Sequence, residues 1–194
     1  MRLADQGAAH RIISSKEAFE GRVIKVFVDE VRLPDGRTVE WERVAHPGAV
    51  GMVPLLPDRT VVMVRQYRNA IGGELLEIPA GKLDRGEAPE ACARRELAEE
   101  VGLSAGRLIK LAEFYNSPGY ADEYFHVYLA MELAEAYGET EQDEFLTVER
   151  YGLDELLEMI TVGRLSDAKS IIGLSLASLY LKGELSEFGG EARR

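Results

Sequence analysis

Residues 81–103 have the sequence GKLDRGEAPEACARRELAEEVGL, and this stretch decides the fold. Its middle is rich in Ala, Glu, Arg and Leu, which form helices readily, and Pro89 stands where the first turn of a helix tolerates proline. Gly102 follows, and glycine is the usual residue just beyond a helix end. We therefore expect a helix over residues 88–101.

The two kinds of side chain on this helix separate by spacing. Ala93, Leu97 and Val101 lie four residues apart and form an apolar stripe that should face a sheet. Glu96 and Glu100 are also four apart and flank this stripe. Their carboxylates can therefore converge near the edge of the domain.

Three further charged residues belong to the same segment. Arg95 and Glu99 have the spacing of an ion pair on one helix face. Glu87 lies just before the helix and can fold back toward the same place. Clustered carboxylates repel one another, and a divalent cation such as Mg²⁺ or Mn²⁺ removes that penalty. Such ions bridge phosphate oxygens and activate water, so the cluster indicates metal-assisted hydrolysis of a phosphate compound.

The charges on this helix also have a purely structural explanation. A run such as RRELAEE is ordinary for the solvated face of an amphipathic helix, and most charge runs simply face water. Considered by itself, the helix favours that explanation.

The chain on either side mixes strands and helices. A hairpin or meander is expected over residues 22–45, turning at Pro34-Asp35-Gly36, and residues before about 20 form a loose or a pairing arm. The apolar run from Val61 to Val64 indicates a strand buried on both faces. The further strands are expected at residues 50–56, 60–67, 75–78, 108–115, 124–132 and 145–150, and the further helices at 153–162 and 168–181. This order favours an α+β or mixed α/β sandwich.

Composition excludes several classes of protein. The chain has 194 residues and a formal net charge of −11, which makes nucleic acid and anionic membrane surfaces poor partners. Cys92 is the single cysteine, so an internal disulfide framework is excluded. No apolar run approaches the roughly 18 residues that span a bilayer, and the start shows no signal-peptide pattern. A soluble, cytoplasmic protein is expected.

The spacing of the charged residues changes the balance between the two explanations of the helix. Gly81 is followed by five residues, Glu87, seven residues, Arg95-Glu96-Leu97, one residue, Glu99-Glu100, one residue and Gly102-Leu103. This resembles the Nudix box, G-x5-E-x7-R-E-U-x-E-E-x-G-U with U aliphatic, at all nine fixed positions.

The resemblance to Nudix hydrolases implies a loop–helix–loop on a mixed β-sheet between helices. It implies an N-terminal β arm over residues 1–47, a catalytic domain over 48–185 and a polar tail over 186–194. Two or three Mg²⁺ ions are expected, with Mn²⁺ as an alternative. The implied metal ligands are the side chains of Glu96, Glu99 and Glu100, with the backbone carbonyl of Ala80. Glu96 and Glu100 are also the expected catalytic residues of the box, while Gly81, Glu87, Arg95 and Gly102 are expected to be structural.

Three segments outside the box resemble the ADP-ribose pyrophosphatase branch. Pro118 lies 15 residues after Leu103, the position of the branch's marker proline. The other two are RQYR at residues 65–68 followed by LEIPAG at 76–81, and SDAKSI at 166–171. Each segment also has a purely structural explanation, such as a loop turn or a surface charge, and only their combination indicates the branch.

Residue roles follow from the resemblance. Arg68 is expected to contact the diphosphate or the terminal ribose, because a guanidinium matches phosphate oxygens. Glu77 and Glu123 are expected near the metal or the ribose hydroxyls, and Gly119 allows close contact with substrate. Phe19 is the candidate for stacking on adenine. A core or dimer contact explains Phe19 equally well, and Trp41 and Arg43 are weaker candidates for the adenine region.

The general base is expected on the late acidic loop GETEQDEFLTVE. Glu144 aligns best, and Glu141 and Asp143 are its rivals. A loop of this kind could close only when substrate and metals are present, and a solvated loop explains each acid as well.

The resemblance implies hydrolysis of ADP-ribose to AMP and ribose 5-phosphate by a homodimer that exchanges N-terminal strands. Another nucleoside diphosphate sugar, GDP-mannose above all, is the main rival substrate. A non-catalytic ADP-ribose-binding regulator is the alternative from a different class, although such modules usually lose box glutamates and this chain keeps all of them.

Overall fold

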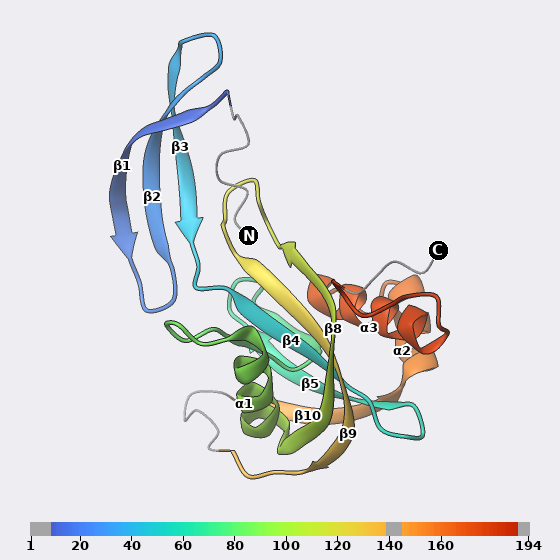
Figure 1. Cartoon of the computed structure of the whole chain (residues 1–194). Coiled ribbons are helices and arrows are strands. Elements are labelled where there is room, and N and C mark those ends of the chain that lie inside the picture. The colour runs from blue at the N-terminus through green and yellow to red at the C-terminus, as the bar shows by residue number, and fades with distance from the viewer. Residues whose placement is uncertain (1–8, 139–144, 190–194) are drawn as a thin grey trace. The chain divides into compact units, whose positions relative to one another are not determined.

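The computed structural model describes residues 9–138 and 145–189. Within these residues the chain forms strands and helices in mixed order (Figure 1). The strands are β1 (Arg11–Glu20), β2 (Lys25–Arg32), β3 (Thr38–Ala45), β4 (Ala49–Pro54), β5 (Thr60–Arg68), β6 (Gly73–Glu77), β7 (Ala80–Lys82), β8 (Leu103–Tyr115), β9 (Tyr124–Glu135) and β10 (Leu146–Gly152). The helices are α1 (Pro89–Val101), α2 (Leu153–Thr161) and α3 (Ala168–Leu181).

These elements belong to two compact units. The first unit contains the described residues up to Gly48 together with Tyr115–Tyr124. The second contains Ala49–Phe114 and the described residues from Phe125 onward. No helix in the described ranges is long and apolar enough to cross a bilayer.

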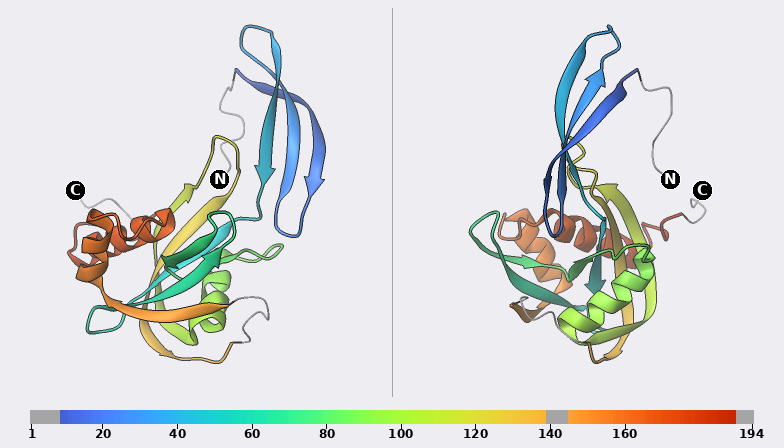
Figure 2. Two further views of the ribbon diagram at one scale, coloured as in Figure 1. Left: turned by 180° about the vertical axis from the view of Figure 1, so that it is seen from behind. Right: turned by 90° about the vertical axis from the view of Figure 1, so that its left-hand side faces the viewer.

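The first unit is built on an antiparallel sheet with the order β1-β2-β3 (Figure 2). The turn expected at residues 34–36 joins β2 to β3: the Leu33 N–H donates to the Arg37 carbonyl at 2.8 Å, and Gly36 has a φ of 88°. Arg11–Glu20 form strand β1, which is paired with β2 along its length, so this part of the expected arm is a paired strand.

The end of β3 is bound to residues of the 115–124 segment in the same unit. The Val44 N–H donates to the Tyr120 carbonyl at 2.7 Å, and the Asp122 N–H donates to the Val44 carbonyl at 3.0 Å. The Asp122 carboxylate also accepts from the His46 N–H at 2.8 Å. These bonds fix the loop that carries Pro118 beside β3.

The second unit contains two sheets where a single mixed sheet was expected. The order in the larger sheet is β7-β4-β9-β8, and β4 runs parallel to β9 and antiparallel to β7. The smaller sheet has the order β10-β5-β6 and is antiparallel. Residues Val61 to Val64 of β5 are all buried, as their unbroken apolar pattern predicts.

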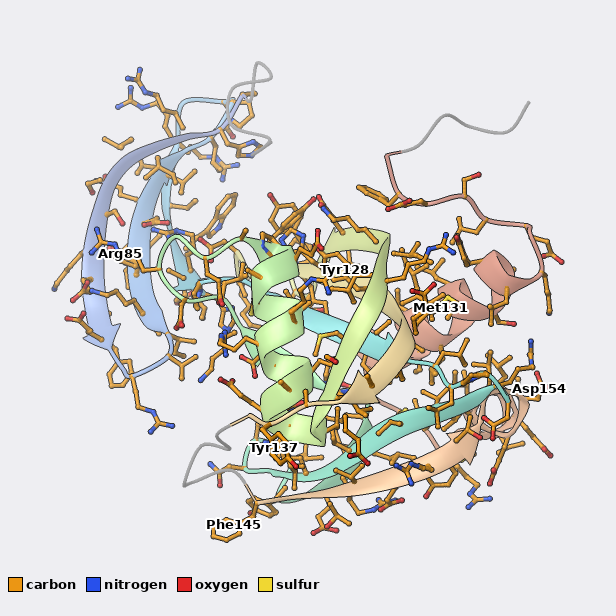
Figure 3. All side chains as sticks on the ribbon, turned by 60° about the horizontal axis from the view of Figure 1, so that its bottom comes forward. Arg85, Tyr128, Met131, Tyr137, Phe145 and Asp154 are labelled. Atoms are coloured by element: carbon orange, nitrogen blue, oxygen red, sulfur yellow. The ribbon has the colours of Figure 1, made fainter. Side chains whose placement is uncertain are left out.

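Alternation along β4 and β9 sends side chains to two separate cores. Val50 and Met52 of β4 pack with Ala93 and Leu97 of α1. Tyr128 of β9, which is labelled in Figure 3, belongs to the same cluster. On the other side, apolar residues of β4, β5 and β9 pack against α2 and α3. The larger sheet therefore carries α1 on one face and α3 on the other, which is the mixed sandwich expected (Figure 1).

Candidate active site

Helix α1 forms where the sequence predicts it. Pro89 occupies the first turn, and Gly102 ends the helix in the left-handed conformation with a φ of 65°. The Gly102 N–H donates to the Ala98 carbonyl at 3.1 Å, which satisfies one of the last carbonyls of the helix. Ala93 and Leu97 are fully buried against the sheet, so the helix presents its glutamates along a fixed edge.

Arg95 joins the helix to the loop before it. Its Nε and one terminal nitrogen donate to the two oxygens of Glu87 at 2.9 Å each. The Asp84 N–H also donates to Glu87, at 3.0 Å. The Arg95 hydrogen bonds hold the pKa of Glu87 at about 2, and the pKa of Arg95 is raised in turn. Glu87 is therefore ionised at neutral pH and closes the loop onto the helix.

The same guanidinium reaches two expected metal ligands. One terminal nitrogen of Arg95 donates to Glu96 at 2.7 Å and to Glu99 at 2.9 Å. The expected Arg95–Glu99 ion pair is thus present, with Glu96 as an additional partner. The Glu96 side chain packs over Gly81, where an added Cβ would lie 1.8 Å from the Glu96 Cδ. A side chain at position 81 would therefore displace this carboxylate.

Glu100 and Ala80 are in direct contact. The Ala80 N–H donates to a Glu100 oxygen at 2.9 Å, and Glu100 is buried, with 6% of its surface exposed. The start of β7 and the end of α1 therefore meet at two residues for which metal ligation is expected, through the Ala80 N–H and the Glu100 carboxylate.

This donor set suits a hard cation in its chemistry. The donors are carboxylate oxygens on successive turns of one helix and a neighbouring backbone segment, and oxygen ligands are what Mg²⁺ and Mn²⁺ prefer. Among the described residues, however, no three acidic, histidine or cysteine side chains are arranged around a common point as a bound ion requires. Arg95 contacts one oxygen of Glu96 and one oxygen of Glu99, so in this arrangement a guanidinium compensates part of the negative charge of both carboxylates.

A second charged group surrounds Glu77, three residues before Ala80. Arg68, at the end of β5, donates from Nε and a terminal nitrogen to the two oxygens of Glu77 at 2.8 and 2.6 Å. The Lys169 ammonium at the start of α3 also contacts Glu77. Burial raises the pKa of Glu77, but the hydrogen bonds and charges of Arg68 and Lys169 outweigh it, so the pKa lies below its ordinary value.

Lys169 and two neighbours were not given roles by sequence reasoning. Asp167 caps α3: its carboxylate accepts from the Ser170 N–H at 3.0 Å and from the Lys169 ammonium at 2.9 Å. Ser170 in turn accepts the Ile78 N–H at 2.8 Å, next to Glu77. The available signal was Asp167 directly before the expected helix at 168–181, since aspartate is a favoured residue at a helix start.

The first unit contributes a separate hollow. A cavity of about 710 Å³ is lined by β1, β2 and β3 residues and by the 115–122 segment. Its lining includes Trp41, Arg43, Tyr115, Gly119 and Tyr120. An indole, two phenol rings and a glycine that allows close approach offer flat, partly apolar surfaces to a planar ligand.

The expected substrate-binding residues of the first unit have different positions. Gly119 lines the cavity. Phe19 on β1 is 57% exposed and does not line the cavity, whereas Trp41 on β3 does. The Glu123 carboxylate lies 3.8 Å from the His46 Nδ1. Arg68, Glu77 and the box residues belong to the second unit.

The expected base falls outside the described residues, as do its rivals Glu141 and Asp143. Glu144 comes directly before Phe145, the first described residue after the gap, which is labelled in Figure 3. On the other side of the gap, Gly138 packs tightly on α1, because an added Cβ would lie 2.5 Å from the Ala98 carbonyl and the Glu99 nitrogen. The acidic loop therefore starts from a point in contact with the box helix.

A loop–helix bearing this spacing of glutamates, set on a mixed sheet with helices on both faces, defines a Nudix domain. The chain belongs to the Nudix family: the model described as "NUDIX domain" matches residues 45–171. A second model, "Nucleoside diphosphate sugar hydrolase N-terminal domain", matches residues 11–44.

Relatives and a solved structure extend this likeness over most of the chain. An ADP-ribose pyrophosphatase of Bacillus subtilis and a methanol dehydrogenase activator of Bacillus methanolicus are each 40% identical, over 87% of this chain and 92% of theirs. A GDP-mannose pyrophosphatase of Escherichia coli is 36% identical over 73% of this chain and 80% of its own. A crystal structure titled "ADP compounds hydrolase" has a TM-score of 0.81 and 25% identity, covering 90% of this chain and 95% of its own.

Proposed function

We propose that this protein hydrolyses ADP-ribose to AMP and ribose 5-phosphate with the help of a divalent metal. The observation that carries the proposal is the short stretch of chain that separates two charged groups in the second unit. Glu77 is held by Arg68 and Lys169, and three residues later Ala80 contacts Glu100 of the box. Three residues span at most about 10 Å, which is the size of a diphosphate with its attached atoms.

The two groups have complementary tasks. Glu96, Glu99, Glu100 and the Ala80 carbonyl would hold two or three Mg²⁺ ions, or Mn²⁺. When bound, the metal supplies positive charge for the phosphate oxygens and a more acidic water. Arg68 is 39% exposed, so its guanidinium can bind a phosphate oxygen while it stays hydrogen-bonded to Glu77. Glu77 fixes the plane of that guanidinium.

Considered by itself, the cavity of the first unit is suited to bind a nucleoside base. The cavity beside Trp41 and Gly119 offers a ring for stacking and close backbone approach. Phe19 stays a candidate for adenine stacking from its exposed place on β1, and Glu123 for a ribose hydroxyl. Stacking accepts any base, so this cavity alone does not choose between adenine and guanine.

Water must lose a proton before or as it attacks phosphorus. We assign the role of general base, which accepts this proton, to Glu144, with Glu141 and Asp143 as alternatives. The reason is that the loop follows Gly138, which packs on α1, so a carboxylate on it can approach the box. The product side needs no further base, since AMP and ribose 5-phosphate leave as anions.

The proposal includes a homodimer and a cytoplasmic location. Every residue of β1 is exposed, including Ile12, Ile13 and Phe19, and among the described strands β1 pairs only with β2. A ten-residue edge strand with exposed apolar side chains favours pairing with a second chain.

The proposal is tested with a substrate panel in Mg²⁺, measuring nucleotide release with and without EDTA. We expect ADP-ribose to have the highest kcat/KM and EDTA to abolish turnover. Glu100→Gln should lower kcat by orders of magnitude while circular dichroism stays unchanged, since it removes a charge from the donor set. A wild-type rate in that variant would remove Glu100 from the catalytic set.

GDP-mannose is the second candidate, because one of the relatives is a pyrophosphatase of that sugar nucleotide. Turnover of GDP-mannose equal to that of ADP-ribose would contradict the narrower proposal and leave a nucleoside diphosphate sugar hydrolase. Tight binding of ADP-ribose without any metal-dependent turnover would instead indicate the non-catalytic regulator.

A further inference from the structure

Lys169 is a charged residue near the candidate site to which the proposed reaction gives no task. It lies in the first turn of α3, and only 12% of its side chain is exposed. Its ammonium contacts Glu77, 92 residues away in sequence, and donates to Asp167 at 2.9 Å. Removing the charge of a lysine from water costs free energy, and the contacts of Lys169 with Glu77 and Asp167 offset this cost.

Glu77 already has a partner without Lys169. The Arg68 guanidinium binds both of its oxygens, which is the strongest geometry an arginine offers a carboxylate. Lys169 adds a second cation to the same carboxylate oxygen that the Arg68 terminal nitrogen contacts. The group of Arg68, Glu77, Lys169 and Asp167 therefore contains two positive and two negative charges and is neutral as a whole.

Removing Lys169 would change the net charge of this group from zero to negative. Asp167 and Glu77 would keep their charges with Arg68 as the only cation, leaving one net negative charge. A guanidinium whose charge is fully compensated by carboxylates has less attraction for phosphate. Glu100 of the box is a further negative charge that acts on Arg68.

We propose that Lys169 is a positioning residue, which neutralises Glu77 from α3 and so leaves the charge of the Arg68 guanidinium for a diphosphate. This inference rests on the proposed function, because it assigns the diphosphate to Arg68. Lys169 acts on the substrate through Glu77 and Arg68 and makes no contact with it. The start of α3, which SDAKSI supplies, is then part of the machinery that selects an anionic substrate.

The test is a double-mutant cycle of Lys169→Met and Glu77→Gln, with ADP-ribose and Mg²⁺. Lys169→Met should raise KM about tenfold and change kcat by less than about threefold, because a ground-state electrostatic contact to the diphosphate is weakened. In the Glu77→Gln background the same substitution should change KM by less than about twofold, since the charge that Lys169 neutralises is gone. Lys182→Met, at the exposed far end of the same helix, is the matched control and should keep the wild-type KM.

Affinity and stability separate the proposal from a structural role. Titration calorimetry with ADP-ribose in EDTA should show the same ratio of affinities without turnover. Thermal unfolding of each variant shows whether it is folded. A Lys169→Met effect on KM that persists unchanged in the Glu77→Gln background would overturn the proposal, as would a loss of stability with KM unchanged.

The proposed function can fail separately. If the wild type neither binds nor cleaves ADP-ribose, that function is wrong, and the same four proteins titrated with inorganic pyrophosphate still test Lys169. Pyrophosphate affinity that is equal in wild type and Lys169→Met would then contradict the inference. If GDP-mannose is the better substrate, the cycle is run on GDP-mannose, because both compounds carry a diphosphate.

Discussion

Gly81 shows how a single missing side chain positions a candidate metal ligand. The Glu96 side chain occupies the space that a Cβ at position 81 would need, 1.8 Å from Cδ and 2.0 Å from Oε1. We expect Gly81→Ala to displace the carboxylate and to lower kcat about tenfold or more, because small misplacements of catalytic groups are costly.

Gly73→Ala is the matched control for this prediction, since a Cβ at position 73 meets nothing within 4 Å. It should keep the wild-type kcat. Equal activity of Gly81→Ala and wild type, measured as AMP release, would show that the placement of Glu96 does not matter for the reaction.

Glu87 makes stability depend on pH at the residue scale. Its pKa is about 2 in the folded chain, against an ordinary value near 4.5, because Arg95 hydrogen-bonds to it. A carboxyl with a lowered folded pKa contributes stability that is fully present above 4.5 and is lost as pH falls toward 2. In Glu87→Gln this contribution is absent at every pH.

We therefore expect the difference in unfolding free energy between wild type and Glu87→Gln to shrink by about 1–2 kcal/mol between pH 6 and pH 3. Urea titrations at both pH values measure it. Glu90→Gln, which removes an exposed ion pair with Arg94, should show a small difference at both. A difference for Glu87→Gln that is the same at both pH values would mean that Arg95 does not stabilise the ionised carboxyl.

At the scale of elements, Ser170 ties α3 to the chain between β6 and β7. Its oxygen accepts the Ile78 N–H at 2.8 Å, and the residue is fully buried. Ser170→Ala leaves that N–H without its partner and should lower the unfolding free energy by about 1–3 kcal/mol. Ser175→Ala, a half-buried position on the same helix, should change it by less than about 0.5 kcal/mol. If the two variants are equally stable in urea, the bond to Ile78 has no net value.

The elements differ in how well the sequence predicts them. Helix α1 and the Arg95–Glu99 pair depend on contacts a few residues apart, so spacing was enough to predict them. The 34–36 turn was predicted for the same reason. Strand β8 begins at Leu103 and not near residue 108, because it follows the α1 cap directly. The alternation of Leu103, Ser104 and Ala105 is short and is followed by Gly106, which is rare in strands.

Long-range contacts are the part that could not be predicted. Glu77 and Lys169 lie 92 residues apart, and nothing local to either indicates the other. The division of the second unit into two sheets depends in the same way on which strands pair, and strand pairing is not encoded in the pattern of any one strand. The choice between Phe19 and Trp41 for stacking on adenine likewise stays a prediction; Trp41 of β3 lines the cavity and Phe19 of β1 does not.

At the scale of the whole molecule, β1 predicts the state of assembly. β1 is an exposed edge strand with apolar side chains, and such a strand favours pairing with a second chain. Light scattering should therefore give the wild type the mass of a dimer, about 43 kDa, which is twice the 21.5 kDa of one chain. Ile13→Asp places a charge on that strand at a position that is 43% exposed and should shift the mass toward one chain. Val23→Asp, in the turn after β1 and 38% exposed, introduces the same charge outside the strand and should leave the dimer intact. A wild type with the mass of one chain would contradict the proposed homodimer. A dimer that both variants retain would show that the interface does not involve β1.

The state of assembly also bears on catalysis. If the substrate site needs residues from both subunits, Ile13→Asp must lose turnover when it is diluted below the dimer dissociation constant. If the site is complete in one chain, turnover per chain must not change on dilution.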